Sequence, residues 1–491
     1  MKRYSVVITA AILMSIKTFG QSDADAIRYS QFVPSGTARS TAMGAAFGAL
    51  GSDFASLSIN PAGIGLYRYS EMTMSPSLFM IKSNSDYDGN TKEENKYQFN
   101  FGNIGAVAHY VLKDNAKTGW LNWDFGIGYN RLNDFNSNIA YEGSNKNSSY
   151  LDYYLGQVNN GVGVNPGNLA NTYPDANLAY QTWLIDTIPG DTNHYRSAVP
   201  FGGTLQRRTA TDKGSMGEIN FAFGANYSNK IYLGASLGIV TLRYIEDVNY
   251  TELDDQDTIA GFKSFTKHEN LTTHGSGVNF KLGMIYRPVD FIRFGISVQT
   301  PTFLGMHDKY SSSFESDMEA KGKFTSDKNQ GEFDYQLTTP LRVTGSLAVI
   351  IGKHGALSVD YEMVDYASAS LTSSTYDFFD QNDLIQTKYT SANNLRAGGE
   401  FRYGAYSVRG GVGMYGTPFA SGVAYKGADM SRMVYSGGLG ISDDTYFVDI
   451  AYQYQVHTDF FRLYKLDTVV VPGSVNKLQS HTFMLTLGMK F

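Results

Sequence analysis

Charged side chains recur at alternate positions of several segments, and they are the residues of this chain best placed for acid–base chemistry. Alternation puts six bases and five acids on the less apolar face of their segments: Glu218, Lys281, Arg293, Arg342, Asp360, Glu362, Arg396, Glu400, Arg402, Arg409 and Asp449. None of these carboxylates stands at a recognisable spacing from a base and a nucleophile. Gly275-Ser276-Gly277 lacks the strand-to-helix context of a nucleophile elbow. We therefore predict that the protein is not an enzyme.

Histidines are the residues most suited to holding a haem, as axial ligands. His194, His268, His274 and His307 lie in or near predicted outer loops, but they are scattered singly, without metal-ligand spacing. We interpret them as solvated loop residues and predict no metal site and no cofactor. The chain has 0 cysteines, which excludes disulfides, thiol nucleophiles and cysteine-based metal sites.

The N-terminus has the layout of a secretory signal. Lys2 and Arg3 precede an apolar run over 6–16, and small residues follow up to Gly20, where we expect cleavage. The run is far shorter than the ~20 residues of a membrane helix, and no later segment is longer. Removing residues 1–20 takes away three bases, so the net charge falls from −6 to −9. Nucleic acid is therefore an unfavourable partner, and the absence of a GxxxxGK[ST] motif argues against nucleotide-driven pumping.

The rest of the chain alternates with period two, the signal of β-strands. Short, turn-forming connections alternate with connections of about 14 to over 80 residues. An even strand number with one tight-turned end and one long-looped end is typical of an outer-membrane barrel. We predict fourteen strands, near 71–81, 97–112, 119–131, 216–227, 231–245, 273–286, 291–302, 335–351, 356–367, 390–403, 406–416, 432–441, 446–457 and 480–491.

The two faces of these strands indicate an all-β transmembrane barrel of a Gram-negative outer membrane. One face carries apolar residues such as Leu233, Leu237 and Phe401, while the other carries the charged row. Charge on a lipid-facing side costs ~2–4 kcal/mol at the midplane, so the apolar rows should face lipid and the charges the lumen. We take Arg342, Asp360, Glu362, Arg396, Glu400 and Arg409 as the lumen wall.

The final strand ends on Phe491, which closes an apolar stripe with Phe483, Leu485, Leu487 and Met489. It resembles the C-terminal signal by which the barrel assembly machinery recognises its substrates. We therefore expect that machinery as a partner, and outer-membrane lipid around the barrel.

The N-terminal segment is unlike any strand. Residues 35–63, SGTARSTAMGAAFGALGSDFASLSINPAG, are rich in Gly and Ala and fit weak helices over 38–47 and 53–58, stopped by Asn60 and Pro61. So few bulky side chains need walls supplied by the rest of the chain. We predict three parts: a signal peptide over 1–20, a hatch in the lumen over 21–68, and the barrel over 69–491.

The hatch and several hairpins resemble the FadL family of outer-membrane transporters for long-chain fatty acids and aromatic hydrocarbons. The resemblance rests on the run from Ala42 to Phe47, on Asn60-Pro61-Ala62-Gly63, on GSGVNFKLGMIYRPVDFIRFGISVQTP over 275–301, on TTPLRVTGSLAV over 338–349, and on LRAGGEF and SVRGGVG. It implies a monomeric fourteen-stranded barrel, a luminal hatch and passive uptake of hydrophobic molecules. It also implies a lateral opening beside a kink in the third strand, near Gly126 and Gly128.

Two candidate sites follow. Asn60, Pro61, Ala62, Gly63 and Phe47 could form the gate, or Asn60 and Pro61 could merely shape the turn into the first strand.

In the long loop over 132–213, a helix over 175–186 would align Tyr180, Trp183 and Leu184, and a second stripe joins Leu151, Tyr154, Leu155 and Val158. These stripes could receive a hydrophobic ligand outside the cell, or could simply pack the loop onto the rim.

We predict passive transport of a hydrophobic small molecule, of fatty acid or hydrocarbon type, through a hatch-gated barrel. A barrel that serves as an adaptor or shuttle for surface or secreted proteins is the alternative from another class, and a receptor for a haem-type ligand is a further one. Outer-membrane proteases and acyltransferases stay as a remote class.

Overall fold

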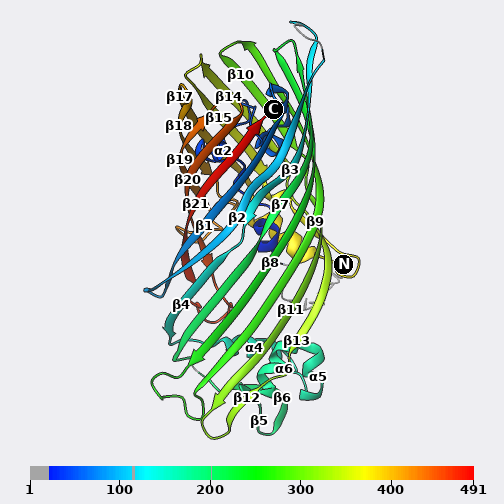
Figure 1. Cartoon of the computed structure of the whole chain (residues 1–491). Helices are drawn as coiled ribbons and strands as arrows, with labels where there is room; N and C mark the ends of the chain where they lie inside the picture. The colour runs from blue at the N-terminus through cyan, green and yellow to red at the C-terminus, as the bar shows by residue number, and fades with distance from the viewer. Residues whose placement is uncertain (1–21, 113–116, 201) are drawn as a thin grey trace, which may run out of the picture.

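The computed structural model describes residues 22–112, 117–200 and 202–491, so the predicted signal peptide lies outside the described residues. Fourteen antiparallel strands close into one barrel, as predicted (Figure 1). Closure is direct, because the first strand pairs with the last from Glu71–Lys490 to Tyr87–Ser474. No helix among the described residues is long and apolar enough to span a membrane.

Ten of the fourteen strands run uninterrupted. They are β1 (Glu71–Tyr87), β2 (Asn90–Val111), β7 (Thr204–Tyr227), β8 (Ile231–Leu253), β9 (Ser264–Val289), β17 (Ser391–Tyr403), β18 (Tyr406–Tyr415), β19 (Arg432–Ser442), β20 (Tyr446–Phe461) and β21 (Ser474–Lys490).

The other four are each broken into two pieces. They are β3 (Trp120–Asp134) with β4 (Ser137–Asn145), β10 (Ile292–Gln299) with β11 (Phe303–Met318), β13 (Asn329–Thr338) with β14 (Arg342–Ile351), and β15 (Gly355–Asp365) with β16 (Ser370–Thr372). Pro301 and Pro340 stand at two of these breaks, where a residue without a backbone N–H cannot continue the ladder.

Helices occupy the N-terminal segment and the long connections. They are α1 (Asp23–Arg28), α2 (Ala38–Ala42), α3 (Ser56–Ile59), η1 (Pro61–Leu66), α4 (Tyr150–Val158), α5 (Pro166–Thr172), α6 (Pro174–Gln181), η2 (Tyr366–Ser368) and α7 (Phe379–Lys388). The hairpin of β5 (Ile185–Ile188) and β6 (Asp191–Ser197) packs beside α4, and β12 (Gly322–Thr325) pairs with β11. We name residues 145–203, which include α4 to α6 and this hairpin, the outer cap.

The strands extend further into the long-looped end than alternation predicts. The predicted loop over 82–96 is wrong, because β1 and β2 continue to a two-residue turn at Asp88-Gly89, both with positive φ. Residues 204–215, 246–253 and 264–272 likewise belong to β7, β8 and β9. These extensions stand beyond the apolar belt, so neither face has to be apolar and the sequence signal fades.

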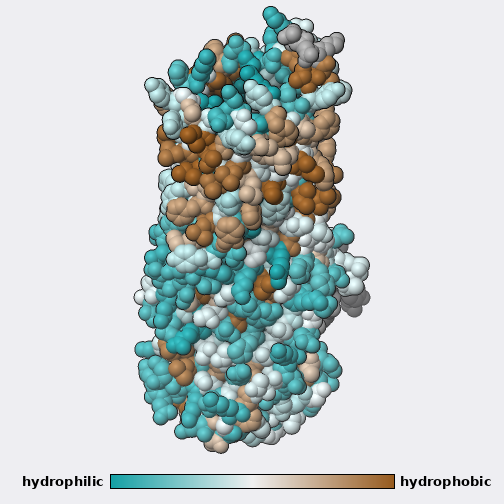
Figure 2. Space-filling view, in the orientation of Figure 1, coloured by the Kyte–Doolittle hydropathy of each residue, from teal (hydrophilic) through white to brown (hydrophobic). Residues whose placement is uncertain are grey.

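Figure 2 shows apolar side chains gathered across the short-turned half of the barrel on the face in view. Exposed apolar residues on all fourteen strands continue this belt around the barrel. Leu233, Leu237 and Phe401 point outward, with 41%, 44% and 59% of their surface exposed. Exposed aromatic residues ring the strand ends at the short turns: Tyr69, Tyr110, Trp120, Tyr227, Tyr286, Phe291, Tyr403, Tyr406 and Tyr446. A closed barrel with such a belt and girdle is the form of a Gram-negative outer-membrane protein, which confirms the predicted location.

Leu237 tests the position of the belt. Leu237→Arg puts a charge near its middle and should destabilise the lipid-inserted barrel by ~2–4 kcal/mol. Asn249 faces outward from the same strand beyond the belt, so Asn249→Arg is the matched control and should change stability by under ~1 kcal/mol. Urea titrations in lipid vesicles measure both, and equal losses in the two variants would contradict the placement.

Candidate functional site

The N-terminal segment lies inside the barrel, where its short helices pack on many strands (Figure 1). α2 contacts β18 to β21, and η1 contacts β3 and β7 to β9. Most side chains from Gly36 to Gly65 are buried. The first predicted helix, over 38–47, is shorter than expected, because positive φ at Gly44 and Ala45 ends it after Ala42. The second lies at Ser56–Ile59 instead of 53–58.

Glycines in the wall let this segment approach closely. A Cβ on Gly234 would lie 2.2 Å from the carbonyl carbon of Pro61, and one on Gly283 would lie 1.9 Å from Oδ1 of Asn60. Any larger residue at either position would push the turn at Asn60 away from β8 and β9. The close fit of the segment therefore depends on the absence of side chains at Gly234 and Gly283 in the wall.

Asn60 joins two turns of the segment. Its Nδ2 donates to the carbonyl of Gly48 at 2.6 Å, and its Oδ1 accepts from the N–H of Ala62 at 3.1 Å. Pro61 begins η1, where its missing N–H costs nothing. Ala62 packs against Tyr232 and Ile285.

Gly63 and Phe47 complete the predicted gate set. The carbonyl of Gly63 accepts from the N–H of Ser52 at 2.9 Å. Phe47 is buried in a separate cluster with Ala348 and Ala356 of β14 and β15. The five predicted gate residues thus lie in two patches, which the bond from Asn60 to Gly48 connects.

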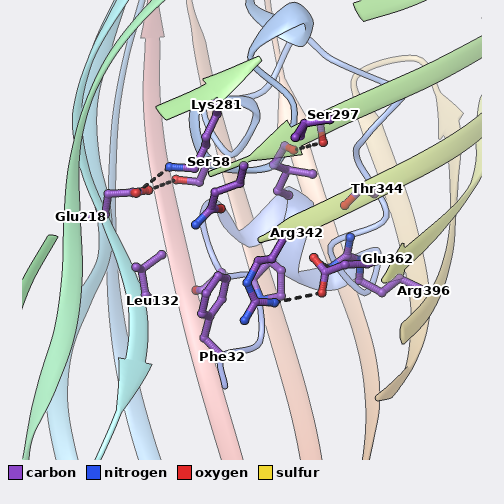
Figure 3. Close-up of a pocket in the computed structure, with 15 residues that line it drawn as sticks. Phe32, Ser58, Leu132, Glu218, Lys281, Ser297, Arg342, Thr344, Glu362 and Arg396 are labelled. Carbon is purple, nitrogen blue, oxygen red and sulfur yellow. Dashed lines mark hydrogen bonds and ion pairs between the residues drawn. The ribbon is translucent and has the colours of Figure 1, made fainter. Parts of the chain in front are cut away.

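The charged row lines the lumen and forms buried ion pairs. Nη1 of Arg342 lies 3.1 Å from Glu362, and Arg396, 1% exposed, lies 3.5 Å from Glu362 and 3.7 Å from Asp360. Figure 3 shows Arg342 directed toward Glu362. The carboxylate of Asp360 accepts from the N–H of Gly48 at 3.0 Å, and Arg342 donates to the carbonyl of Ser30. Two wall residues thus hold the backbone of the N-terminal segment.

A second group of charges lies nearer the short turns. Glu400 bridges Arg39 of α2, at 3.0 Å, and Arg409, at 2.6 Å, and Arg409 also lies 2.5 Å from Asp449. All six predicted wall residues are therefore brought together in two networks. Arg402 lies on the same inner face at the mouth of the barrel, 3.5 Å from Glu400, with 46% of its side chain exposed.

Sequence reasoning missed the partners that the N-terminal segment contributes. Arg39 and Asp53 are the charged residues of 35–63. A charge in a segment that must be buried requires a partner. Arg39 finds it in Glu400 of the wall, whereas Asp53 accepts hydrogen bonds from Thr37 and Ala55 of the segment itself. Ser58 was missed as well: its hydroxyl donates to Glu218 at 3.2 Å, and Lys281 approaches the same carboxylate at 2.5 Å (Figure 3).

A large cavity of about 1080 Å³ lies in the lumen toward the long loops. Its lining mixes apolar and charged side chains from α1, α7, β1 to β4, β7, β20 and β21. Apolar residues include Ile27, Phe79, Ile81, Leu132 and Phe135. The cavity is large enough for a lipid-sized molecule.

The barrel ladder is interrupted beside this cavity. Within the described residues, the backbone pairing of β2 with β3 ends at Asn103–Asn130, so 90–102 of β2 pair with β1 alone. Side chains span the interval: Asn100 Nδ2 donates to Asp134 at 3.0 Å, and Asn138 donates to the carbonyl of Asn95 at 3.2 Å.

The expected position of the lateral opening, at Gly126 and Gly128, is wrong. Both residues pair regularly with β2 and β7. A Cβ on Gly126 would lie 3.1 Å from Leu57, and one on Gly128 would lie 2.4 Å from Phe54. These glycines make room for the N-terminal segment, and the interruption begins after Asn130.

The outer cap does not display the predicted docking stripe. α6 ends at Gln181, so Trp183, which has a positive φ, lies beyond the helix. Trp183 is 40% exposed, and Nζ of Lys321 lies 3.3 Å from the centroid of its ring. Leu184 is fully buried, and Tyr180 packs edge-on against Tyr195. Tyr180, Trp183 and Leu184 therefore share no exposed face. In the second stripe, Leu151, Tyr154 and Val158 are buried and Leu155 packs against their cluster.

A buried ion pair holds the outer cap on the strands. Nζ of Lys267 on β9 lies 3.0 Å from Asp175 of α6 and 2.8 Å from Glu269, among the rings of Tyr150, Tyr154 and Phe314. Burial opposes ionisation of Asp175, but Lys267 and hydrogen bonds outweigh it and lower the pKa of this carboxyl.

The four predicted loop histidines do not gather in the cavity. His194 contacts Asp191 at 2.7 Å in the outer cap, and His268 contacts Asn249 at 2.6 Å. His274 and His307 face each other across β9 and β11. The described residues contain no group of three or more potential ligands suited to a metal ion.

Asn60→Ala should loosen the N-terminal segment. It removes the hydrogen bonds of the side chain with Gly48, Ala62 and Met284 and leaves buried partners unsatisfied, at a cost of ~1–3 kcal/mol. We expect more frequent ion-conducting events in planar bilayers. Asn168→Ala, at an exposed position of α5, is the control, and unchanged conductance in Asn60→Ala would refute an anchoring role.

Asp175→Asn should weaken the outer cap by ~1–3 kcal/mol, because Lys267 loses a buried partner. The depressed pKa means that the carboxylate stabilises the folded cap above its usual value of 3.8 and that this contribution disappears as pH falls through the folded pKa. Cleavage of the cap by thermolysin near neutral pH measures the loss. Asp191→Asn, at an exposed site, is the control and should be cleaved at the wild-type rate. A wild-type cleavage rate in Asp175→Asn would contradict a stabilising role of the ion pair.

No family model and no curated protein matches the sequence. Three solved structures share the fold. A FadL homologue from Pseudomonas aeruginosa has 12% identity and a TM-score of 0.56, covering 94% of this chain and 99% of its own. The toluene transporter TodX from P. putida has 14% identity and a TM-score of 0.54, over 94% and 99%. The monoaromatic hydrocarbon channel CymD has 12% and 0.50, over 94% and 98%. The chain therefore has the barrel fold of the FadL and TodX structures, as the resemblance predicted.

Proposed function

We propose that the protein is a passive channel that admits hydrophobic small molecules through the outer membrane, with residues 22–68 as its hatch. The observation that carries this proposal is the coincidence of the cavity with the interrupted ladder. Asn100 and Gly102 of β2 and Arg131 to Ser137 of β3 and β4 line the cavity. A solute in the cavity therefore lies beside an interruption in the backbone ladder of the wall.

The lining suits an apolar solute with room for a polar end. Burying a methylene gains ~0.8 kcal/mol, so Ile27, Phe79, Ile81, Leu132 and Phe135 can hold an alkyl chain or an aromatic ring. A path that leaves sideways into the membrane spares such a solute the charged networks of the lumen. Fatty acids or hydrocarbons are the substrate class that we propose, and two of the solved structures that share the fold are a toluene transporter and a monoaromatic hydrocarbon channel.

The hatch acts in this proposal as a stopper that moves locally. Asn60, Pro61, Ala62, Gly63 and Phe47 seal it against β8, β9, β14 and β15. Complete expulsion would break the buried contacts to Asp360 and Glu400 as well, and breaking a buried ion pair costs ~3–5 kcal/mol. A small shift of the hatch near the cavity therefore has a lower energy barrier than its complete expulsion.

We further propose that the barrel works as a monomer and is recognised for assembly by its last strand. Phe491 is 66% exposed, and its backbone exchanges hydrogen bonds with Ser70 next to the first strand. The adaptor alternative gains no specific support from the outer cap, where Leu151, Tyr154, Leu155 and Val158 pack inward.

Closing the interrupted ladder tests the channel. The chain has 0 cysteines, so Asn100→Cys with Asp134→Cys can be bridged cleanly by a short bis-thiol reagent. We expect bridging to block uptake of radiolabelled fatty acid or toluene by cells that lack other channels for them, and reduction of a cleavable reagent to restore it.

Thr251→Cys with Thr266→Cys is the matched control, because these hydroxyls lie 2.9 Å apart on the regular ladder of β8 and β9. Bridging this pair should leave uptake unchanged. Full uptake in the variant with positions 100 and 134 completely bridged would rule out the lateral path. Absence of uptake in the wild-type protein would contradict the channel and favour the adaptor alternative.

A further inference from the structure

A second cavity, of about 530 Å³, lies at the short-turned end of the barrel, beneath the N-terminal segment. Seven lysine and arginine side chains line it against three aspartates and glutamates. We name it the periplasmic vestibule. It is separate from the large cavity, because the N-terminal segment lies between the two.

Part of this positive charge has partners within the protein. Arg39 and Arg409 share Glu400, and Arg287 reaches Asp290 in the neighbouring turn. Asp290 has 95% of its side chain exposed, so water weakens that pair.

Arg293 and Arg68 have no carboxylate partner within ion-pair distance among the described residues. Arg293 donates to the carbonyl of Leu50, and its Nε is buried without an acceptor, as is the Nε of Arg287. Repulsion from Arg287, Arg68 and Arg39 reaches the Arg293 guanidinium. Four guanidinium groups therefore converge on the vestibule, and at least two of their donors point at no protein oxygen.

We propose that the periplasmic vestibule binds an oxyanion, the carboxylate or phosphate group of a small molecule or of a lipid head group. Arg293, Arg287 and Arg68 are its ligands. The planar guanidinium fork matches two oxygens of one phosphate or carboxylate, and a bound anion relieves the mutual repulsion of the arginines. The short turns lie at the inner surface of the membrane, so a dissolved anion and a phospholipid head group both have access.

This site does not depend on the proposed channel. Arg39 joins it to the N-terminal segment, because the same side chain holds Glu400 of the wall and the carbonyl of Ser52. An anion in the vestibule therefore contacts the segment from the side opposite to the large cavity.

Thermal unfolding of the purified barrel in neutral detergent tests the site. Inorganic phosphate should raise the unfolding midpoint saturably, compared with chloride at the same ionic strength. Arg287→Gln with Arg293→Gln should weaken the apparent phosphate affinity about tenfold or more, the loss expected for a charge-assisted hydrogen bond. Arg293→Lys keeps the positive charge but lacks the guanidinium fork. Its phosphate affinity should lie between those of wild type and the double variant.

Arg207→Gln is the matched control, since Arg207 is exposed on β7 at the opposite end and pairs with Glu142. It should bind phosphate as wild type does. Should the double variant fail to fold, Arg68→Gln at an exposed position provides the second test. Absence of a saturable phosphate effect, or equal affinity in wild type and a folded vestibule variant, would overturn the proposal.

Short-chain phosphatidylglycerol distinguishes the two sources of the anion. If dihexanoyl-phosphatidylglycerol binds more tightly than inorganic phosphate, while dihexanoyl-phosphatidylcholine binds weakly, the site takes an anionic lipid head group. If inorganic phosphate binds as tightly as the anionic lipid, the site takes a dissolved anion. Both results require the same arginines.

Discussion

Charge inside the bore is the constraint on which the rest of this structure depends. A buried carboxylate or guanidinium is costly unless it is paired, and the inner wall carries many of both. Pairing within the wall is incomplete. Asp360 accepts from the backbone of Gly48, Arg342 donates to the carbonyl of Ser30, and Glu400 needs Arg39 as well as Arg409. The N-terminal segment is therefore held at specific points by the wall, and filling the bore is only part of its contribution.

Small residues make these contacts possible. Where the wall has glycine, at Gly234 and Gly283, the turn at Asn60 comes within contact of the strand backbone. Where the segment has glycine, at Gly44, its backbone meets Val412 of β18. Dispersion between closely packed backbones adds to the polar contacts. The Gly- and Ala-rich composition, too poor to build a core alone, is therefore what lets the N-terminal segment pack closely against the barrel wall.

The same division between lipid and bore explains what the sequence could reveal. All fourteen strands were predicted, because Leu233, Leu237 and Phe401 must face lipid while Arg396 and Glu400 must not. This alternation of apolar and polar residues is required only where a strand faces lipid. Beyond the belt it fades, so the sequence predicts loops at the hairpin around Asp88 and at the long ends of β7 to β9.

The site shows a similar limit. The position of Asn60, Pro61 and the wall charges inside the barrel could be predicted from composition, periodicity and family resemblance. The predicted stripe of Tyr180, Trp183 and Leu184 is wrong. The helix ends at Gln181, so Trp183 and Leu184 no longer follow helical spacing. The break in the ladder after Asn130 depends on which strands fail to pair, and one strand's sequence carries no such information. Hydrogen bonds and ion pairs therefore anchor the N-terminal segment to the wall. Beside the large cavity, beyond the last backbone pair of β2 with β3, side-chain hydrogen bonds join β2 to β3 and β4.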